Sequence, residues 1–344
     1  MLSRPTKQWV ACGIDVGFSK SARSSAIAAF TVVGNAGRPR IALWGETEVL
    51  DARTLDSFID RRVGPLADPH VRLVTVDAPL TRDVLFARPN EARAVDRRFA
   101  RGAFHNSKRG PQPSSIRVPA QGWPLYQRGM DLLRRLDRVG FPYASVPTSG
   151  DSMLVGRATM EVLPKLTLAL VCPRAWLAVD RPRTGFFSQI DNWLFSKMFL
   201  PVLAEQPGLA RPESPGAVEW PLELDQTVVR EAERIGALGK GDRHEAIGAF
   251  VAGFQGALAL AGQACVVGTE DAHFLLPKTW HSDWDAAWES TTRSGEATTR
   301  RGVSVMALSS HETDYSTDLL GDASSDAQEL NLVSESSANR RQTP

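Results

Sequence analysis

The sequence predicts an α/β protein whose mixed sheet is flanked by helices. Two apolar runs support this class, because each has the continuous hydrophobicity of a buried strand and each ends on a carboxylate. Residues 10–14 run into Asp15, and residues 71–76 run into Asp77. A charged carboxylate is costly inside a sheet unless a partner such as a metal ion pairs with it. We therefore expect an acidic site at one sheet edge, although Asp15 could instead only close the turn at Gly17.

The segments between the two acids predict the order of the elements. Residues 25–33 and 41–50 are apolar runs typical of strands, and the intervening Gly34-Asn35-Ala36-Gly37 suits a hairpin turn. Residues 55–63 then carry apolar side chains at helical spacing. The expected order is strand, strand, strand, helix, strand, with acids at the ends of the first and fourth strands. Neighbouring strands that deliver two carboxylates to one edge can build a metal site.

Composition and charge exclude some classes. The chain has 344 residues, is 42% hydrophobic and 23% charged, and has a net charge of +1, which gives no global electrostatic argument for nucleic acid. No apolar run approaches the roughly 20 residues that span a bilayer, so we expect no membrane partner. The N-terminus lacks the apolar core of a signal peptide. The three cysteines are odd in number and without metal-ligand spacing, so we expect a cytoplasmic protein.

Basic residues concentrate directly after Asp77. Residues 81–110 contain eight basic side chains against three acidic ones. Such a run usually forms a solvated helical face, but its position beside the expected acids also suits contacts to a phosphate backbone. In the second interpretation, the residues that contact substrate phosphates are Arg93, Arg97, Arg98 and Arg101.

Two more acids lie in the second half of the chain. Residues 159–163 have strand character and carry Glu161 before Pro164 ends the run. A long helix rich in small residues begins near Gly241, and Glu245 in its first turn could simply complement the helix dipole. Its glycines would let this helix pack closely on a sheet. Further expected elements are helices over residues 125–139 and 190–204 and strands over residues 264–268 and 274–277.

The composition changes near residue 289. Beyond it Ser, Thr, Asp and Glu dominate without a sustained hydrophobic period, and nine acids outnumber five arginines. We therefore expect a folded domain over residues 8–288 and a disordered acidic tail over residues 289–344. The tail is interpreted as an inert extension or as a competitor for a basic groove.

Five short motifs in this order resemble the family called domain of unknown function 429. That family is grouped with predicted nucleases of ribonuclease H-like fold, and the resemblance covers roughly residues 8–280. The motifs are Gly13-Ile14-Asp15-Val16-Gly17, Val76-Asp77-Ala78-Pro79-Leu80, Asp96-Arg97-Arg98, Glu161-Val162-Leu163-Pro164 and His244-Glu245-Ala246.

The resemblance implies a ribonuclease H-like domain and metal-assisted hydrolysis of phosphodiester bonds. Mg²⁺ or Mn²⁺ would activate water and stabilise the leaving oxygen of a nucleic acid, either DNA or RNA. The implied metal ligands are Asp15, Asp77 and Glu245. Glu161 is implied as a fourth catalytic carboxylate, which could be a fourth metal ligand.

Two departures from the family pattern keep other functions open. This chain has Leu163 where the family usually has an aromatic residue or His, and Glu245 where it usually has Asp. A decayed site would leave a non-catalytic nucleic-acid-binding or ligand-binding module. Sugar kinases of actin-like fold also begin with Gly-Ile-Asp-x-Gly. They need a second glycine-rich phosphate loop, for which residues 150–290 offer no candidate.

Overall fold

A computed structural model provides the fold. The chain divides into two compact units, residues 1–305 and 306–344, and every described residue belongs to the first unit. The structure describes residues 8–17, 24–34, 38–51, 70–82, 122–144, 152–153, 156–171, 195–200, 221–269, 271–278 and 299–304, together with residues 56, 59, 93, 95 and 203.

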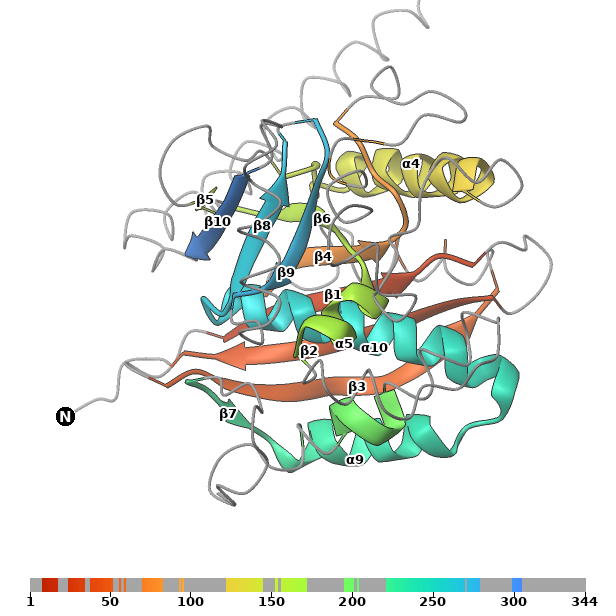
Figure 1. Cartoon of the computed structure of the whole chain (residues 1–344), viewed down its shortest axis with the longest axis vertical. Helices are drawn as coiled ribbons and strands as arrows, with labels where there is room; N and C mark the ends of the chain where they lie inside the picture. Colours follow the sequence, from red (N-terminus) through yellow and green to blue (C-terminus); the bar gives the residue numbers. More distant parts are fainter. Residues whose placement is uncertain are drawn as a thin grey trace, which may run out of the picture. The chain divides into compact units, whose positions relative to one another are not determined.

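Four strands lie side by side in the sheet (Figure 1): β1 (Gln8–Asp15), β2 (Ser25–Val33), β3 (Arg40–Leu50) and β4 (Val71–Asp77). β1 pairs antiparallel with β2 on one side and parallel with β4 on the other. β2 and β3 form the predicted antiparallel hairpin. The predicted order of these strands is therefore confirmed.

Six further strands extend the sheet on both sides. They are β5 (Ser152–Met153), β6 (Ala158–Val162), β7 (Glu223–Leu224), β8 (Ala264–Gly268), β9 (His273–Pro277) and β10 (Thr299–Ser304). The spatial order is β5-β10-β8-β9-β6-β4-β1-β2-β3-β7. β6 is parallel to β4 and β9 is parallel to β6, whereas β8 is antiparallel to both of its neighbours. The sheet is therefore mixed, as predicted.

The last of these strands lies in the segment predicted to be disordered. β10 pairs antiparallel with β8, and Val303 is the register partner of Ala264. The sheet thus continues past the predicted boundary at residue 288. The composition of this segment is polar, but its backbone can still complete a strand edge, because ladder hydrogen bonds do not require apolar side chains.

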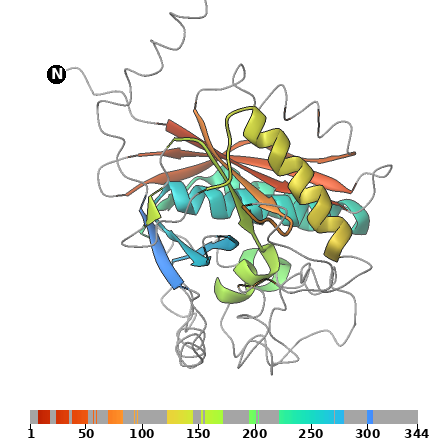
Figure 2. The ribbon, with the colours of Figure 1, turned by 90° about the horizontal axis from the view of Figure 1, so that it is seen from above.

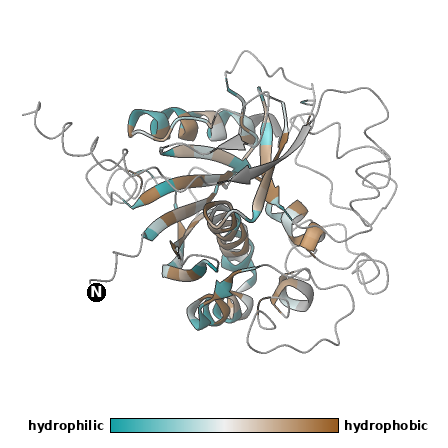
Figure 3. Cartoon of the chain, turned by 90° about the vertical axis from the view of Figure 1, so that its left-hand side faces the viewer, coloured by the Kyte–Doolittle hydropathy of each residue, from teal (hydrophilic) through white to brown (hydrophobic). Residues whose placement is uncertain are grey.

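Two long helices, α4 (Gly122–Arg138) and α10 (Lys240–Leu260), belong to separate hydrophobic cores on the two faces of the sheet; Figure 2 draws α4 in yellow and α10 in teal. Alternate residues of β1 point to the two faces. Cys12 and Ile14 belong to the core beneath α4, whereas Ala11 belongs to the core that contains α10. In α4, apolar and polar residues alternate along the helix (Figure 3), and its apolar residues enter the core.

Glycine lets α10 lie directly on the central strands. A Cβ atom on Gly13 of β1 would lie 2.0 Å from the backbone nitrogen of Gly253 in α10. Beside this contact, the hydroxyl of Thr75 donates a hydrogen bond to the carbonyl oxygen of Ala252, at 2.7 Å. The predicted close packing of this helix is confirmed, and residues 246–260 are buried throughout.

Two helices were not expected from the sequence: α5 (Pro164–Val171) and α9 (Gln226–Ala237). Pro164, expected only to stop the preceding strand, is also the first residue of α5, a position that proline tolerates. The predicted helices over residues 55–63 and 190–204 fall mostly outside the described residues. Within the second lies η3 (Phe195–Phe199), a short π-helical turn. None of the helices in the described residues is long and apolar enough to cross a membrane.

Candidate functional site

The two strand-end acids are direct neighbours in the sheet. Asp15 ends β1, Asp77 ends β4, and the parallel register of these strands makes the two residues partners. Asp15 is buried, with 7% of its surface exposed. The turn that follows is tight: the Gly17 amide donates to the Ser25 hydroxyl at 3.2 Å, and a Cβ atom on Gly17 would collide with the Ser24 carbonyl oxygen. Both carboxylates therefore leave the sheet at the same edge.

A third acid reaches this edge from α10. The carboxyl group of Glu245 forms a hydrogen bond with Asp15. Gly248, one turn later in α10, lies against the same carboxylate. A Cβ atom at this position would be 2.1 Å from Asp15 Oδ2. Only a residue without a side chain lets the helix approach Asp15 this closely. The small residues of α10 thus let the helix lie close to Asp15. This close approach places Glu245 at the sheet edge in addition to packing the core.

The protonation of Glu245 reflects this environment. Burial raises its pKa to about 7; the hydrogen bond with Asp15 acts in the opposite direction, and the nearby charge of Asp242 adds to the rise. Two carboxyl groups in contact resist double ionisation and share a proton instead. Near neutral pH the Asp15–Glu245 pair can therefore hold one proton, or a cation in its place.

The donor set suits a hard divalent cation, but only two acids are in contact. Mg²⁺ and Mn²⁺ prefer carboxylate oxygens, which Asp15 and Glu245 supply together, and Asp77 is adjacent in register. Across the residues that the structure describes, no three His, Cys, Asp or Glu side chains are gathered closely enough to hold a metal ion. The arrangement fits a metal site whose third ligand would have to move closer.

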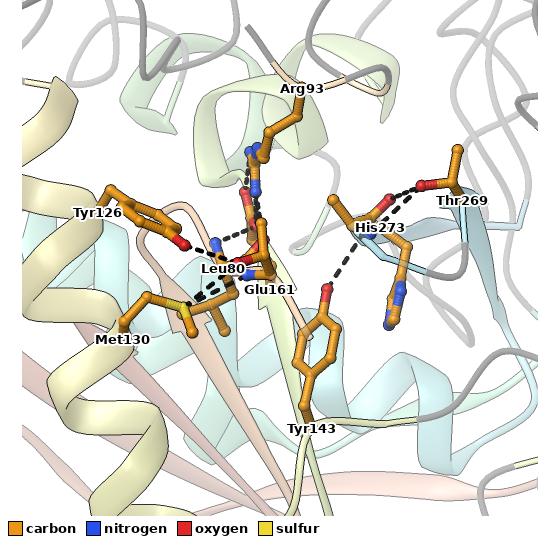
Figure 4. Close-up of polar contacts among 10 residues, drawn as sticks. Leu80, Arg93, Tyr126, Met130, Tyr143, Glu161, Thr269 and His273 are labelled. Carbon is orange, nitrogen blue, oxygen red and sulfur yellow. Dashed lines mark hydrogen bonds and ion pairs between the residues drawn. The ribbon is translucent and has the colours of Figure 1, made fainter. Parts of the chain in front are cut away.

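Glu161 lies in a different environment from the one expected for a metal ligand. Its side chain, 3% exposed, forms a bidentate ion pair with Arg93, in which Nη2 lies 2.8 Å from Oε1 and Nη1 contacts Oε2 (Figure 4). Glu161 Oε2 also accepts a hydrogen bond from the Leu80 amide at 2.6 Å. The structure thus brings Glu161 together with an arginine and a backbone amide. Its proposed catalytic role stays a prediction.

The four arginines expected at substrate phosphates divide into two groups. The side chain of Arg93 is 3% exposed and faces Glu161, so its guanidinium is directed into the protein. Arg97, Arg98 and Arg101 lie outside the described residues. Sequence reasoning missed the pairing of Arg93. The available signal was Glu161 itself, because an acid inside an apolar strand needs a cation or several hydrogen bonds.

A second polar group beside this pair was also missed. His273 is fully buried and stacks on Tyr143, with ring centroids 4.6 Å apart, while its backbone amide donates to the Tyr143 hydroxyl (Figure 4). Burial lowers the pKa of His273 to about 3 and raises that of Tyr143. Both rings are therefore neutral at physiological pH. The ring nitrogens of His273 have no hydrogen-bond partner in the described part of the chain.

A cavity of about 250 Å³ lies beside the start of α10. Its walls include Thr47 and Val49 of β3, Arg234 of α9 and Asp242 of α10. Asp242 precedes Glu245 by one helical turn, so the cavity and the acid pair share this end of α10. The residues that line the cavity do not include Asp15, Asp77 or Glu245.

The arrangement at the sheet edge can hold a proton or a cation on Asp15 and Glu245, with Asp77 across the strand pairing. No protein-family model, no curated protein and no solved structure matches this chain.

Proposed function

We propose that this protein is a divalent-metal-dependent nuclease of ribonuclease H-like type. The observation that carries the proposal is the register of Asp15 with Asp77 on adjacent parallel strands, combined with the hydrogen bond between Asp15 and Glu245. Three carboxylates from two strands and one helix then lie at one edge of the sheet. Mg²⁺ or Mn²⁺ is the proposed cofactor and a nucleic acid, DNA or RNA, the proposed substrate.

The order of the central strands supports the ribonuclease H-like part of the proposal. The resemblance to domain of unknown function 429 implies that fold, with acids at the ends of the first and fourth strands. β1, β2 and β3 are successive antiparallel neighbours, and β4 lies parallel to β1 on its other side. This topology is why Asp15 and Asp77 can be register partners.

In the proposed mechanism the protein supplies orientation and a proton-binding pair. A bound Mg²⁺ or Mn²⁺ would activate water and stabilise charge on the leaving oxygen. Asp15 is fixed by the tight turn at Gly17 and by the backbone of α10 at Gly248. Glu245 holds a proton near neutral pH. It would release this proton to solvent if the pair held a cation, because the charges of both carboxylates would then be compensated.

The Asp15→Asn variant tests this function. We expect the wild-type protein to melt at a higher temperature in Mn²⁺, because a ligand that binds only the folded state stabilises it. Asp15→Asn should remove the Mn²⁺ effect and all divalent-dependent cleavage. Without metal, and above pH 7 where Glu245 loses its proton, it should be at least as stable as the wild type, because the repulsion between the two ionised acids is removed. The matched control is Asp137→Asn, the same change at an exposed position of α4.

A non-catalytic nucleic-acid-binding or ligand-binding module is the second candidate. It is favoured by the fact that, within the described residues, two acids rather than three are gathered. A wild-type protein that binds DNA or RNA with unchanged affinity in EDTA, and cleaves neither in Mn²⁺ or Mg²⁺, would establish this candidate. If Mn²⁺ does not change the melting temperature of the wild-type protein and neither DNA nor RNA is cleaved, the nuclease proposal is rejected.

A further inference from the structure

We propose that Glu161 and Arg93 are positioning residues that fix Asp77 through the peptide groups of Leu80. This inference rests on the proposed function, because it assigns Asp77 to the metal site. It replaces two separate expectations, that Glu161 is a metal ligand and that Arg93 contacts substrate phosphate, by one shared role.

The pair holds both polar groups of one residue. Leu80 follows Asp77 by three positions, on the segment that leaves the end of β4. Its amide donates to Glu161 Oε2 at 2.6 Å, and its carbonyl oxygen accepts from Arg93 Nη1 at 2.7 Å (Figure 4). The chain is therefore fixed immediately beyond the proposed metal ligand. We call these four contacting groups, two from the Arg93–Glu161 ion pair and two from Leu80, the Leu80 clamp.

The clamp is anchored in the sheet. Glu161 is the register partner of Val76, the residue before Asp77, so its side chain starts beside the strand that carries the ligand. On its other side the register partner of Glu161 is Phe274, and the Arg93 guanidinium lies 5.2 Å from the centre of that ring. A buried ion pair with aromatic contact has few alternative positions. The ion pair can therefore hold the amide and carbonyl groups of Leu80 in fixed positions.

The same segment is also held from α4. The hydroxyl oxygens of Thr81 and Tyr126 lie 2.7 Å apart and form a hydrogen bond. A Cβ atom on Gly129 would lie 2.8 Å from the Cβ of Ala78, so α4 packs closely against this turn. Residues 78–81 thus have contacts with α4 on one side and with the clamp on the other.

The protein contains a second clamp of the same chemistry far along the sequence. Glu231 Oε1 accepts from the Thr47 amide at 2.6 Å, Arg234 Nη2 donates to the Thr47 carbonyl oxygen at 2.9 Å, and the two side chains form an ion pair. Thr47 lies in β3 at an irregularity of its pairing with β2. This Thr47 clamp binds the backbone at a bulge in β3 and not the segment that follows Asp77. It is therefore the matched control for a purely structural role.

The test compares two single variants with a double variant by their Mn²⁺ affinity, measured by electron paramagnetic resonance on folded protein. We expect Arg93→Met and Glu161→Gln each to weaken Mn²⁺ binding about 10- to 100-fold, the range for loss of a residue that orients a metal ligand. The Arg93→Met/Glu161→Met variant should lose no more than either single variant, since one clamp is broken in each. Because this double variant replaces both charged side chains by apolar ones, it should fold even if a single variant, which leaves one buried charge unpaired, does not.

The Thr47 clamp supplies the control. Glu231→Gln should lower the melting temperature but leave Mn²⁺ affinity within about twofold, because the strand that it holds, β3, carries no proposed ligand. Loss of binding in Glu161→Gln but not in Arg93→Met would make Glu161 a ligand and overturn the positioning role. Unchanged affinity in all variants of the Leu80 clamp would overturn it too. A wild-type protein that binds no Mn²⁺ would instead overturn the proposed function and this inference with it.

Discussion

Two glutamates near the carboxyl ends of the central strands have opposite partners. Glu161 on β6 is matched by Arg93 and by a backbone amide, so its negative charge is compensated within the protein. Glu245 on α10 is matched by another acid, Asp15, and its pKa rises to about 7. An acid paired with arginine can stay ionised without a ligand, whereas an acid paired with an acid needs a proton or a cation. The partner therefore indicates the role better than the position in the sheet.

Glu231 extends the comparison to a third acid. Burial alone would raise its pKa, but hydrogen bonds from Arg234 and from the Thr47 amide hold the pKa below its ordinary value. Like Glu161, it joins an arginine to the backbone of one residue. In the part of the chain that the structure describes, Arg–Glu pairs thus hold the backbone at Leu80 and at Thr47, whereas an acid–acid pair lies at the sheet edge.

Breaking the buried Arg93–Glu161 pair should have the largest effect on stability. Removing one partner leaves an uncompensated buried charge, so Arg93→Met should lower the free energy of unfolding by about 3–5 kcal/mol. Arg234→Met should cost less: the Arg234 side chain is 35% exposed, so water can take the place of its guanidinium beside the Glu231 carboxylate, which is itself 3% exposed. Urea denaturation of both variants gives the comparison. Equal losses would show that burial does not separate the two pairs.

The acid–acid pair should appear in the pH dependence of stability. The pKa of Glu245 is raised to about 7 from 4.5, so the folded state binds more protons between these values. Stability should then fall as pH rises from 5 to 8, by an amount on the order of 2 kcal/mol. The buried neutral His273 acts with the opposite sign, because its pKa is lowered and acid favours the unfolded state.

The measurement is therefore a difference between variants. Glu245→Gln removes the titration but keeps the side chain's size, and the wild-type loss between pH 5 and pH 8 should exceed that of Glu245→Gln. His273 contributes equally to both proteins and cancels. A wild-type curve parallel to that of the variant would mean that the acids do not share a proton.

The acidic edge could be predicted because its evidence is local in the sequence. The apolar runs before Asp15 and Asp77 fix where the strands end, and both ends are confirmed. Glu245 could be placed near the start of α10, but its contact with Asp15 depends on the packing of α10, which Gly248 permits. Helix periodicity alone does not determine which strand a helix terminus reaches.

The partner of Glu161 could not be predicted from local pattern. Residues 81–110 offer eight basic side chains, and nothing in their spacing singles out Arg93 as the buried one. Two other elements that were not predicted differ in the signal that their sequences carry. Val228, Ala232 and Ile235 lie at helical spacing and are the buried face of α9. The strand β10 had only a short apolar patch at Val303 within a polar segment, which composition assigns to disorder.

The contact between Gly248 and Asp15 gives a smaller test of the same pair. Gly248→Ala places a Cβ against the Asp15 carboxylate, and overpacking of this kind costs about 1–3 kcal/mol, less the gain in helix propensity. It should also separate Asp15 from Glu245 and so reduce the pH dependence described above. The control is Gly241→Ala in the same helix, where a Cβ would meet nothing within 4 Å. If Gly248→Ala is as stable as Gly241→Ala, α10 does not press against Asp15.

The smallest expected effect on stability separates Arg93 from the other arginines proposed to contact phosphate. Reversing the charge of Arg97, Arg98 and Arg101 to Glu should change the free energy of unfolding by less than about 0.5 kcal/mol for each substitution, in contrast to Arg93→Met. It should weaken nucleic-acid binding and flatten its dependence on salt, because each lost phosphate contact reduces the logarithmic salt slope by about 0.9 for duplex DNA. Binding to a fluorescent duplex across a salt series measures both quantities. Unchanged affinity at every salt concentration would assign these three arginines to a solvated face. If binding weakens but the salt slope stays the same, the three arginines act through the fold, as Arg93 does. The distinction between these three residues and Arg93 would then be lost.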